Sequence, residues 1–160
     1  ALGNGFAPAR AGKRPLLIGG GVGVPPLYGL CRNLIEAGAR PTVILGFNTE
    51  REVFYKEEFE KLGAEVLVAT ADGSMGQKGF VTDVLRNIKE PATFFYTCGP
   101  EPMLKALDKA LAEGLEGEMS FEERMGCGFG ACMGCSCETR YGAKRICKDG
   151  PVLERSEILW

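Results

Sequence analysis

Two kinds of segment alternate along the chain. Short, nearly continuous apolar runs are typical of buried strands, and longer segments with a helical apolar repeat are typical of amphipathic helices. Strands are predicted at residues 14–21, 41–47, 65–70, 92–99 and 116–123. Helices are predicted at residues 25–38, 52–63, 80–90 and 100–114. Pro25 near a helix start, and Gly38 and Gly63 at helix ends, support these limits.

This alternation predicts an α/β fold, because continuously apolar strands are buried on both faces by helices. We predict a doubly wound five-stranded parallel sheet formed by residues 14–123. Residues 1–13 are rich in Gly, Ala and Pro, and we predict a linker there. Residues 124–160 lose both patterns and contain too little apolar material for a core of their own. We predict that they form a small irregular C-terminal subdomain that needs a metal.

The composition excludes several classes of function. The chain has 160 residues, a formal net charge of −2 and no histidine. The charge balance predicts no nucleic-acid partner. We expect no membrane association, because no apolar run approaches the roughly 18 residues that span a bilayer. The first residues have no apolar signal core, so we expect a cytoplasmic protein with reduced thiols. Without histidine, Ser-His and Cys-His catalytic pairs and Cys₂His₂ zinc sites are excluded.

Five of the seven cysteines lie within residues 127–147. The spacing Cys127-x4-Cys132-x2-Cys135, with Cys147 further on, matches that of plant-type [2Fe–2S] proteins. Structural zinc sites more often use two C-x2-C pairs, and this segment has one. We predict Cys127, Cys132, Cys135 and Cys147 as cluster ligands. We predict Cys137 as a spectator, and it is the alternative third or fourth ligand. Zinc binding and unligated thiols are the alternatives.

Glycines between these cysteines favour the cluster. A [2Fe–2S] centre with four thiolates is an anion, and backbone N–H groups that face its sulfurs offset the charge. A loop that closes around it needs residues without Cβ that reach positive φ. The segment supplies four such residues, namely Gly126, Gly128, Gly130 and Gly134.

A second glycine-rich stretch, "LLIGGGVGVPP" at residues 16–26, joins the first strand to the first helix. Parallel sheets bind dinucleotides at such turns. The strict G-x-G-x-x-G fingerprint is absent, because Pro26 stands at its third glycine, and no acidic residue ends the second strand. An ordinary Rossmann dehydrogenase is therefore disfavoured, and a tight turn without a ligand is the alternative. "YTCGPEPM" at residues 96–103 is predicted at the same edge of the sheet, where Cys98 could also be a small buried residue.

The loop "GGGVG" and the motif "CGPEPM" together resemble the NAD(P)-binding domain of the ferredoxin-reductase superfamily. The later "EERMGCGFGACMGCSC…RICKDGPV" resembles the cluster-binding end of the electron-transfer subunits of NAD-dependent dihydroorotate dehydrogenases. The resemblance covers nearly the whole chain. It implies a ferredoxin-reductase-like NAD-binding domain at residues 14–123 and a [2Fe–2S]-binding domain at residues 124–160.

The resemblance also implies electron transfer in pyrimidine biosynthesis. NADH would deliver a hydride to FAD, and the [2Fe–2S] cluster would pass electrons to an FMN-containing dihydroorotate dehydrogenase catalytic subunit. The pyrophosphate of NADH would lie against Gly20, Gly21, Gly23 and Val24. Close to the nicotinamide would lie Cys98, Gly99, Pro100 and Glu101. Cys127, Cys132, Cys135 and Cys147 would hold the cluster.

Members of that family carry an N-terminal FAD-binding β-barrel, which nothing in residues 1–160 resembles. We therefore expect FAD to bind mainly through a domain absent from this chain, and the chain alone to be inactive as an oxidoreductase. Two rival functions stay open: a flavin reductase subunit of another redox complex, such as a hydrogenase or sulfur reductase, and a zinc-stabilised nucleotide-binding module. NADH is favoured over NADPH, because Glu50 and Glu52 flank Arg51.

Overall fold

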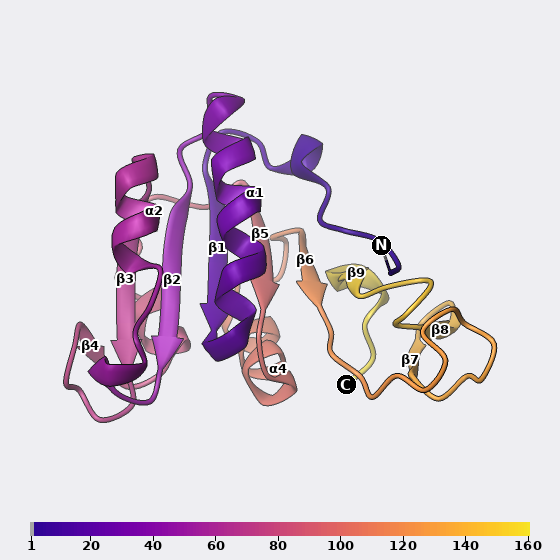
Figure 1. Ribbon diagram of the computed structural model, residues 1–160. Coiled ribbons are helices and arrows are strands. Elements are labelled where there is room, and N and C mark those ends of the chain that lie inside the picture. Colours follow the sequence, from indigo (N-terminus) through magenta and orange to yellow (C-terminus); the bar gives the residue numbers. More distant parts are fainter. Residues whose placement is uncertain (1) are drawn as a thin grey trace.

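The computed structural model describes residues 2–160 and has a central β-sheet with helices on both faces (Figure 1). The strands are β1 (Pro15–Gly20), β2 (Thr42–Phe47), β3 (Glu65–Thr70), β4 (Gln77–Lys78), β5 (Phe94–Cys98), β6 (Gly117–Ser120), β7 (Ser136–Thr139), β8 (Gly142–Arg145) and β9 (Val152–Glu154). The α-helices are α1 (Val24–Glu36), α2 (Lys56–Leu62), α3 (Val81–Leu85) and α4 (Glu101–Ala110). Short 3₁₀ turns are η1 (Pro8–Arg10), η2 (Gly21–Gly23), η3 (Glu50–Glu52) and η4 (Arg155–Glu157).

The main sheet has the strand order β4-β3-β2-β1-β5-β6-β9. The five predicted strands are all present and pair in parallel, so the predicted fold class is confirmed. Two further strands extend the sheet beyond the prediction. β4 contributes only two backbone pairs to β3, and β9 runs antiparallel to β6. Neither strand contains an apolar run long enough to predict it from the sequence.

Helices cover both faces of the sheet, as the doubly wound prediction requires. On one face Leu17 packs in a cluster with Leu27 of α1 and Phe59 of α2. On the other face Ile18 packs in a cluster with residues of α3 and α4, including Leu104. Leu17 and Ile18 are adjacent in β1 and both fully buried, which explains the continuous apolar run of this strand.

Three helices are clearly shorter than predicted, and one of them, α4, predicted at residues 100–114, covers only Glu101–Ala110. The segment predicted at residues 52–63 becomes helical only at Lys56. Tyr55, with a left-handed φ of 65°, cannot be part of a right-handed helix and is the N-cap of α2. The ring of Tyr55 packs edge-on against that of Tyr28 at 5.2 Å between centroids, which stabilises this conformation. The segment predicted at residues 80–90 is helical only over Val81–Leu85 and continues as turns.

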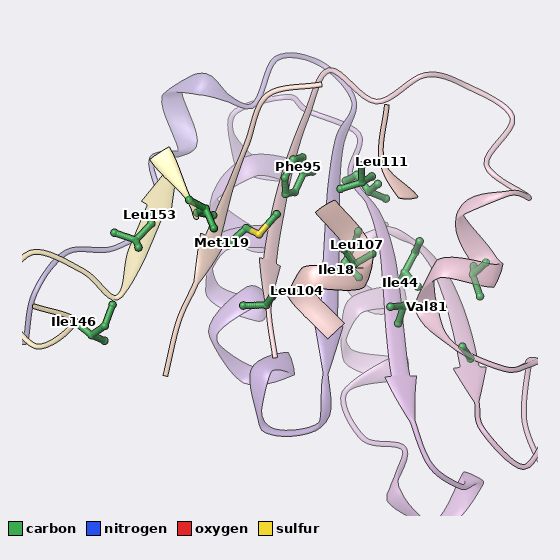
Figure 2. Packing of buried hydrophobic residues seen from close by; sticks show 14 of the residues in the cluster. Ile18, Ile44, Val81, Phe95, Leu104, Leu107, Leu111, Met119, Ile146 and Leu153 are labelled. Atoms are coloured by element: carbon green, nitrogen blue, oxygen red, sulfur yellow. The ribbon is translucent and has the colours of Figure 1, made fainter. Parts of the chain in front are cut away.

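The cysteine-rich segment shares the core of the sheet. Ile146 and Leu153 belong to the same buried cluster as Phe95 of β5 and Met119 of β6 (Figure 2). The hairpin of β7 and β8 lies beside the sheet, beyond β9 (Figure 1). The segment therefore obtains its burial from the sheet, as expected for a piece too small to form its own core.

The residues predicted as a linker lie along the β5–β6–β9 side of the sheet. Asn4 exchanges two hydrogen bonds of 2.9 Å with the backbone of Val152 in β9. The Tyr96 hydroxyl donates to the carbonyl of Ala7 at 2.8 Å, and the N–H of Ala7 donates to Glu118 at 2.9 Å. These bonds tie the N-terminal residues to three neighbouring strands.

Arg155 ties the C-terminal residues to α4. Its guanidinium donates to the carboxylate of Asp108 at 2.7 Å and to the carbonyls of Asp108, Ala112 and Leu115 at 2.6–2.8 Å. The Asp108 carbonyl lies in the last turn of α4, where carbonyls have no partner inside the helix, so this arginine caps the helix and also holds the loop that follows it. The indole N–H of Trp160 donates to the other carboxylate oxygen of Asp108 at 2.8 Å.

We expect Arg155→Ala to lower the free energy of unfolding by about 2–4 kcal/mol, because it leaves several partly buried carbonyls and the Asp108 carboxylate without their hydrogen-bond donor. Urea unfolding followed by circular dichroism measures this change. Arg32→Ala is the matched control, since Arg32 is exposed and 3.9 Å from Glu36, and should change stability by less than about 0.5 kcal/mol. Equal effects of the two variants would contradict the capping role.

Candidate functional site

The strand order reverses between β1 and β5, and the loops after these two strands lie at the same edge of the sheet. Gly19 of β1 is directly opposite Cys98 of β5 in the parallel register. β2 and β3 follow on one side, and β6 on the other. Open α/β sheets bind ligands at such a switch point, outside the carboxyl ends of the strands.

The loop after β1 is shaped by two glycines with different roles. Gly21 has a left-handed φ of 52° and open space around it, so its role is conformational. Gly23 has ordinary dihedral angles, but a Cβ there would lie 2.1 Å from the carbonyl oxygen of Cys98 and 2.7 Å from the nitrogen of Gly99. The loop after β1 therefore packs directly on the loop after β5.

The backbone donors at this edge come from the loop rather than from the first turn of α1. The N–H of Val24 bonds to the carbonyl of Gly21, and Pro25 and Pro26 have no N–H. Gly23, at the N-cap of α1, has no side chain that could accept a hydrogen bond from the free N–H groups of the loop. Any anion bound here would be contacted by N–H groups in the Gly20–Gly23 segment.

The predicted residues around the two loops come together. Gly20 and Gly99 both approach Met103 of α4, whose sulfur or methyl group would lie within 2.5 Å of a Cβ at either position. Pro100 is the N-cap of α4, and Glu101 is its first residue. Glu101 lines a pocket of about 380 Å³ together with Pro100 and with Phe121 and Glu122, which follow β6.

The Cys98 thiol lies close to Ser120 of β6 and to Glu122, which follows β6, and neither residue was predicted to belong to the site. Cys98 is opposite Ser120 in the parallel register of β5 and β6. Burial raises the pKa of Cys98, the hydroxyl of Ser120 lowers it by hydrogen bonding, and the charge of Glu122 raises it. The thiol therefore stays protonated at neutral pH. Ser120 and Glu122 could have been found from the predicted strand at residues 116–123, which ends at this edge.

The four cysteines predicted as ligands lie in two pairs. The backbone N–H of Cys132 donates to the Cys127 sulfur, and the backbone N–H of Cys147 donates to the Cys135 sulfur, so the two cysteines of each pair lie close together. The segments that carry the two pairs are also linked, because Arg145, two residues before Cys147, donates to the carbonyl of Gly130 in the loop that carries Cys127 and Cys132. Within residues 2–160, no group of three or more His, Cys, Asp or Glu side chains is placed to hold a single metal ion.

Backbone N–H groups point at these sulfurs. Ala131 and Cys132 donate to the Cys127 sulfur at 3.3 and 3.5 Å, and Cys147 donates to the Cys135 sulfur at 3.4 Å. Backbone hydrogen bonds from Cys132, and then from Phe129 and Ala131, lower the pKa of Cys127 to about 6. A thiolate is therefore stabilised at Cys127 at neutral pH, which is the state that binds metals.

Three residues of this loop have positive φ, namely Gly128 at 74°, Gly130 at 88° and Met133 at 59°. They turn the backbone so that its N–H groups face inward. A Cβ at Gly126 would lie 3.2 Å from the Cys132 sulfur, which is a tight contact. The glycines thus serve the two purposes expected of them, tight turns and close approach to sulfur.

The remaining cysteines lie elsewhere. Cys137 is on β7, its side chain packs against the core beneath, and burial raises its pKa. Cys31 is completely buried in α1, and burial raises its pKa to about 11. Cys137 packs against the same buried cluster as Cys135 and Cys147, whereas Cys31 belongs to the cluster on the other face of the sheet. Within residues 2–160, no helix is long and apolar enough to cross a membrane.

Two family descriptions match the chain. The family described as "Oxidoreductase NAD-binding domain" matches residues 17–109. The family described as "Iron-sulfur cluster binding domain of dihydroorotate dehydrogenase B" matches residues 122–159. The first match contains both loops of the switch point, and the second contains all four paired thiols.

Curated relatives with similar sequences are electron transfer subunits of dihydroorotate dehydrogenase B (NAD(+)). The protein from Geobacillus sp. (strain WCH70) is 49% identical over 99% of this chain and 63% of its own length. That from Fusobacterium nucleatum is 48% identical over 89% of this chain and 56% of its own length. The chain therefore spans less than two thirds of the length of these relatives.

Among solved structures, an NADH-dependent reduced ferredoxin-NADP oxidoreductase, studied for flavin-based electron bifurcation, matches with a TM-score of 0.87 and 33% identity. The match covers 99% of this chain and 58% of that one. The cytochrome b5 reductase domain of Ulva prolifera nitrate reductase, 24% identical with a TM-score of 0.55 over 68% of this chain and 48% of that one, shares the fold. The chain therefore belongs to the oxidoreductase NAD-binding domain family, and its similarity to the electron transfer subunits of dihydroorotate dehydrogenase B continues through the iron–sulfur segment.

Proposed function

We propose that this chain is an electron-transfer component that passes electrons from NADH, through FAD and a [2Fe–2S] cluster, to a dihydroorotate dehydrogenase catalytic subunit. When bound, the cluster supplies a one-electron carrier between a flavin and the partner. The observation that carries the proposal is the arrangement of four thiols in two pairs. The proposed ligands are Cys127, Cys132, Cys135 and Cys147.

The donor set fits a [2Fe–2S] cluster. Such a cluster has two irons, and each takes two protein ligands. Two neighbouring thiol pairs suit this division, whereas a structural zinc ion needs all four ligands around one atom. The N–H groups directed at Cys127 and Cys135 would offset the negative charge of the cluster.

The switch-point loops are the proposed NADH site. We infer that the pyrophosphate binds along Gly20, Gly21, Gly23 and Val24, with the N–H groups of this loop as donors. The nicotinamide would lie at the loop after β5, formed by Cys98, Gly99, Pro100 and Glu101. A protonated, half-buried Cys98 adds no negative charge next to the ring that gives up the hydride.

The end of β2 favours NADH over NADPH. The carboxylate of Glu52 accepts hydrogen bonds from the backbone and side-chain nitrogens of Asn48, at 3.2 and 3.0 Å, and is therefore held close to the carboxyl end of β2. A carboxylate in this position binds a ribose diol and repels a 2′-phosphate.

The proposed partner is an FMN-containing dihydroorotate dehydrogenase catalytic subunit, and the proposed location is the cytoplasm. The names of the curated relatives support this partner. Exposed apolar side chains surround the thiol loop: Phe129 is 71% exposed, Met133 50% and Met125 42%. Apolar side chains gathered in this way are typical of a surface that a partner covers.

A second candidate is a flavin reductase subunit of another redox complex. The match to the NADH-dependent reduced ferredoxin-NADP oxidoreductase over nearly the whole chain favours it. Affinity purification from the source cell, with the chain expressed in its native context, separates the two. An FMN-binding partner that oxidises dihydroorotate supports the first function, and a different redox partner supports the second.

We expect the purified chain, after anaerobic reconstitution with iron and sulfide, to be red-brown, with visible charge-transfer bands and an EPR signal on reduction. Cys132→Ser should lose at least about 90% of the cluster, because it breaks one thiol pair. Cys137→Ser is the matched control and should keep the cluster. Iron and acid-labile sulfide analysis measures both.

A normal cluster content in Cys132→Ser would overturn the ligand assignment. A colourless protein that binds one zinc ion per chain, with no cluster after reconstitution, would overturn the redox function itself.

We expect Gly23→Ala to weaken NADH binding by about tenfold or more, a cost of at least roughly 1.4 kcal/mol. The added methyl group clashes with the Cys98–Gly99 peptide and forces the two loops apart. Calorimetric titration with NADH measures the affinity. Gly29→Ala, in the middle of α1 with open space around it, is the control and should bind NADH normally with equal or higher stability. Unchanged binding in Gly23→Ala would contradict the proposed site.

A further inference from the structure

A salt bridge lies at the end of β8, next to the paired thiols. The guanidinium of Arg145 donates from Nε to Oδ2 of Asp149 at 2.8 Å and from Nη2 to Oδ1 at 3.3 Å. The backbone N–H of Arg145 donates to the same carboxylate at 3.0 Å. The two side chains are 26% and 31% exposed, so water screens the pair only in part.

Arg145 also contacts the loop that carries the first thiol pair. Its Nη1 donates to the carbonyl of Gly130 at 2.9 Å. This carbonyl belongs to the same peptide unit as the N–H of Ala131, which donates to the Cys127 sulfur at 3.3 Å. One peptide therefore links the arginine to a thiol, and a cation at its oxygen strengthens the hydrogen bond from its N–H.

The second thiol pair lies close to the same side chain. Cys147 is two residues along the chain from Arg145, and the neighbouring Ile146 N–H donates to the carbonyl of Cys135 at 3.0 Å. The guanidinium, held in place by Asp149, is therefore a cation bound to the loop of the first pair and two residues from a thiol of the second.

We propose that Arg145 and Asp149 form a charge pair that sets the reduction potential of the cluster, Arg145 raising the potential and Asp149 lowering it. The inference rests on the proposed function, since it requires the cluster. Arg145 is a positioning residue that acts on the cluster through the Gly130–Ala131 peptide and through its charge.

The signs follow from electrostatics. Reduction by one electron adds one negative charge, which a nearby cation stabilises and a nearby anion destabilises. Arg145→Gln leaves Asp149 as an uncompensated anion, whereas Asp149→Asn leaves Arg145 as an uncompensated cation. A merely structural role predicts something different, because loss of either partner would loosen the loop in the same way.

The experiment is an EPR-monitored redox titration of the reconstituted full chain. We expect Arg145→Gln to lower the equilibrium constant for reduction about tenfold, which is about 59 mV for one electron. We expect Asp149→Asn to raise it by a similar factor. Arg145→Lys, which keeps the charge, should stay close to the wild type. Arg140→Gln, which neutralises an exposed arginine between β7 and β8, is the control and should shift the constant less than about twofold.

Shifts of both variants in the same direction, or no shift in either, would overturn the inference. If Arg145→Gln fails to hold a cluster, Asp149→Asn carries the same test, because it keeps the arginine and must raise the potential. A wild-type chain that forms no cluster would overturn the proposed function and this inference together. A normal cluster with unmoved potentials would overturn this inference alone.

Discussion

The cysteine-rich segment has no hydrophobic core of its own. Its apolar side chains are buried by packing against the sheet. Ile146 and Leu153 extend the cluster around Phe95 and Met119, and β9 pairs with β6. The same strand β6 ends beside Cys98 with Ser120. Cys127 follows Ser120 by seven residues, which reach at most about 25 Å when fully extended. The shared core and this short connection keep the thiols within a limited distance of the switch point.

The switch point depends on contact between two loops. Gly23 lies directly against the Cys98–Gly99 peptide, so the loops after β1 and β5 form one surface. The prolines of α1 remove N–H groups that a first helical turn would normally present. This explains how a loop without the strict dinucleotide fingerprint still offers backbone donors: the donors come from residues before the helix.

Local spacing and periodicity predicted the features that depend on nearby residues. The apolar runs indicated the five parallel strands, and the spacing from Cys127 to Cys135 selected thiols that the structure brings into pairs. β4 and β9 were missed, because strands of two or three residues gain their hydrogen bonds from distant partners rather than from a pattern of their own. Arg155 was missed for a similar reason, because it donates to backbone carbonyls, such as that of Leu115, that any sequence provides. The charge of Arg145 near the cysteines is visible in the sequence, but its hydrogen bond to the Gly130 carbonyl is not.

β9 also determines how the sheet ends. An exposed strand edge presents unpaired N–H and C=O groups to other chains and invites edge-to-edge aggregation. β9 pairs with the outer side of β6. The side chain of Asn4 in turn hydrogen-bonds to the backbone N–H and C=O of Val152 in β9. At the opposite edge β4 has only two residues, one of them Lys78. The cysteine-rich segment therefore also shields this edge of the sheet from self-association, so a protein that keeps this segment folded stays protected there.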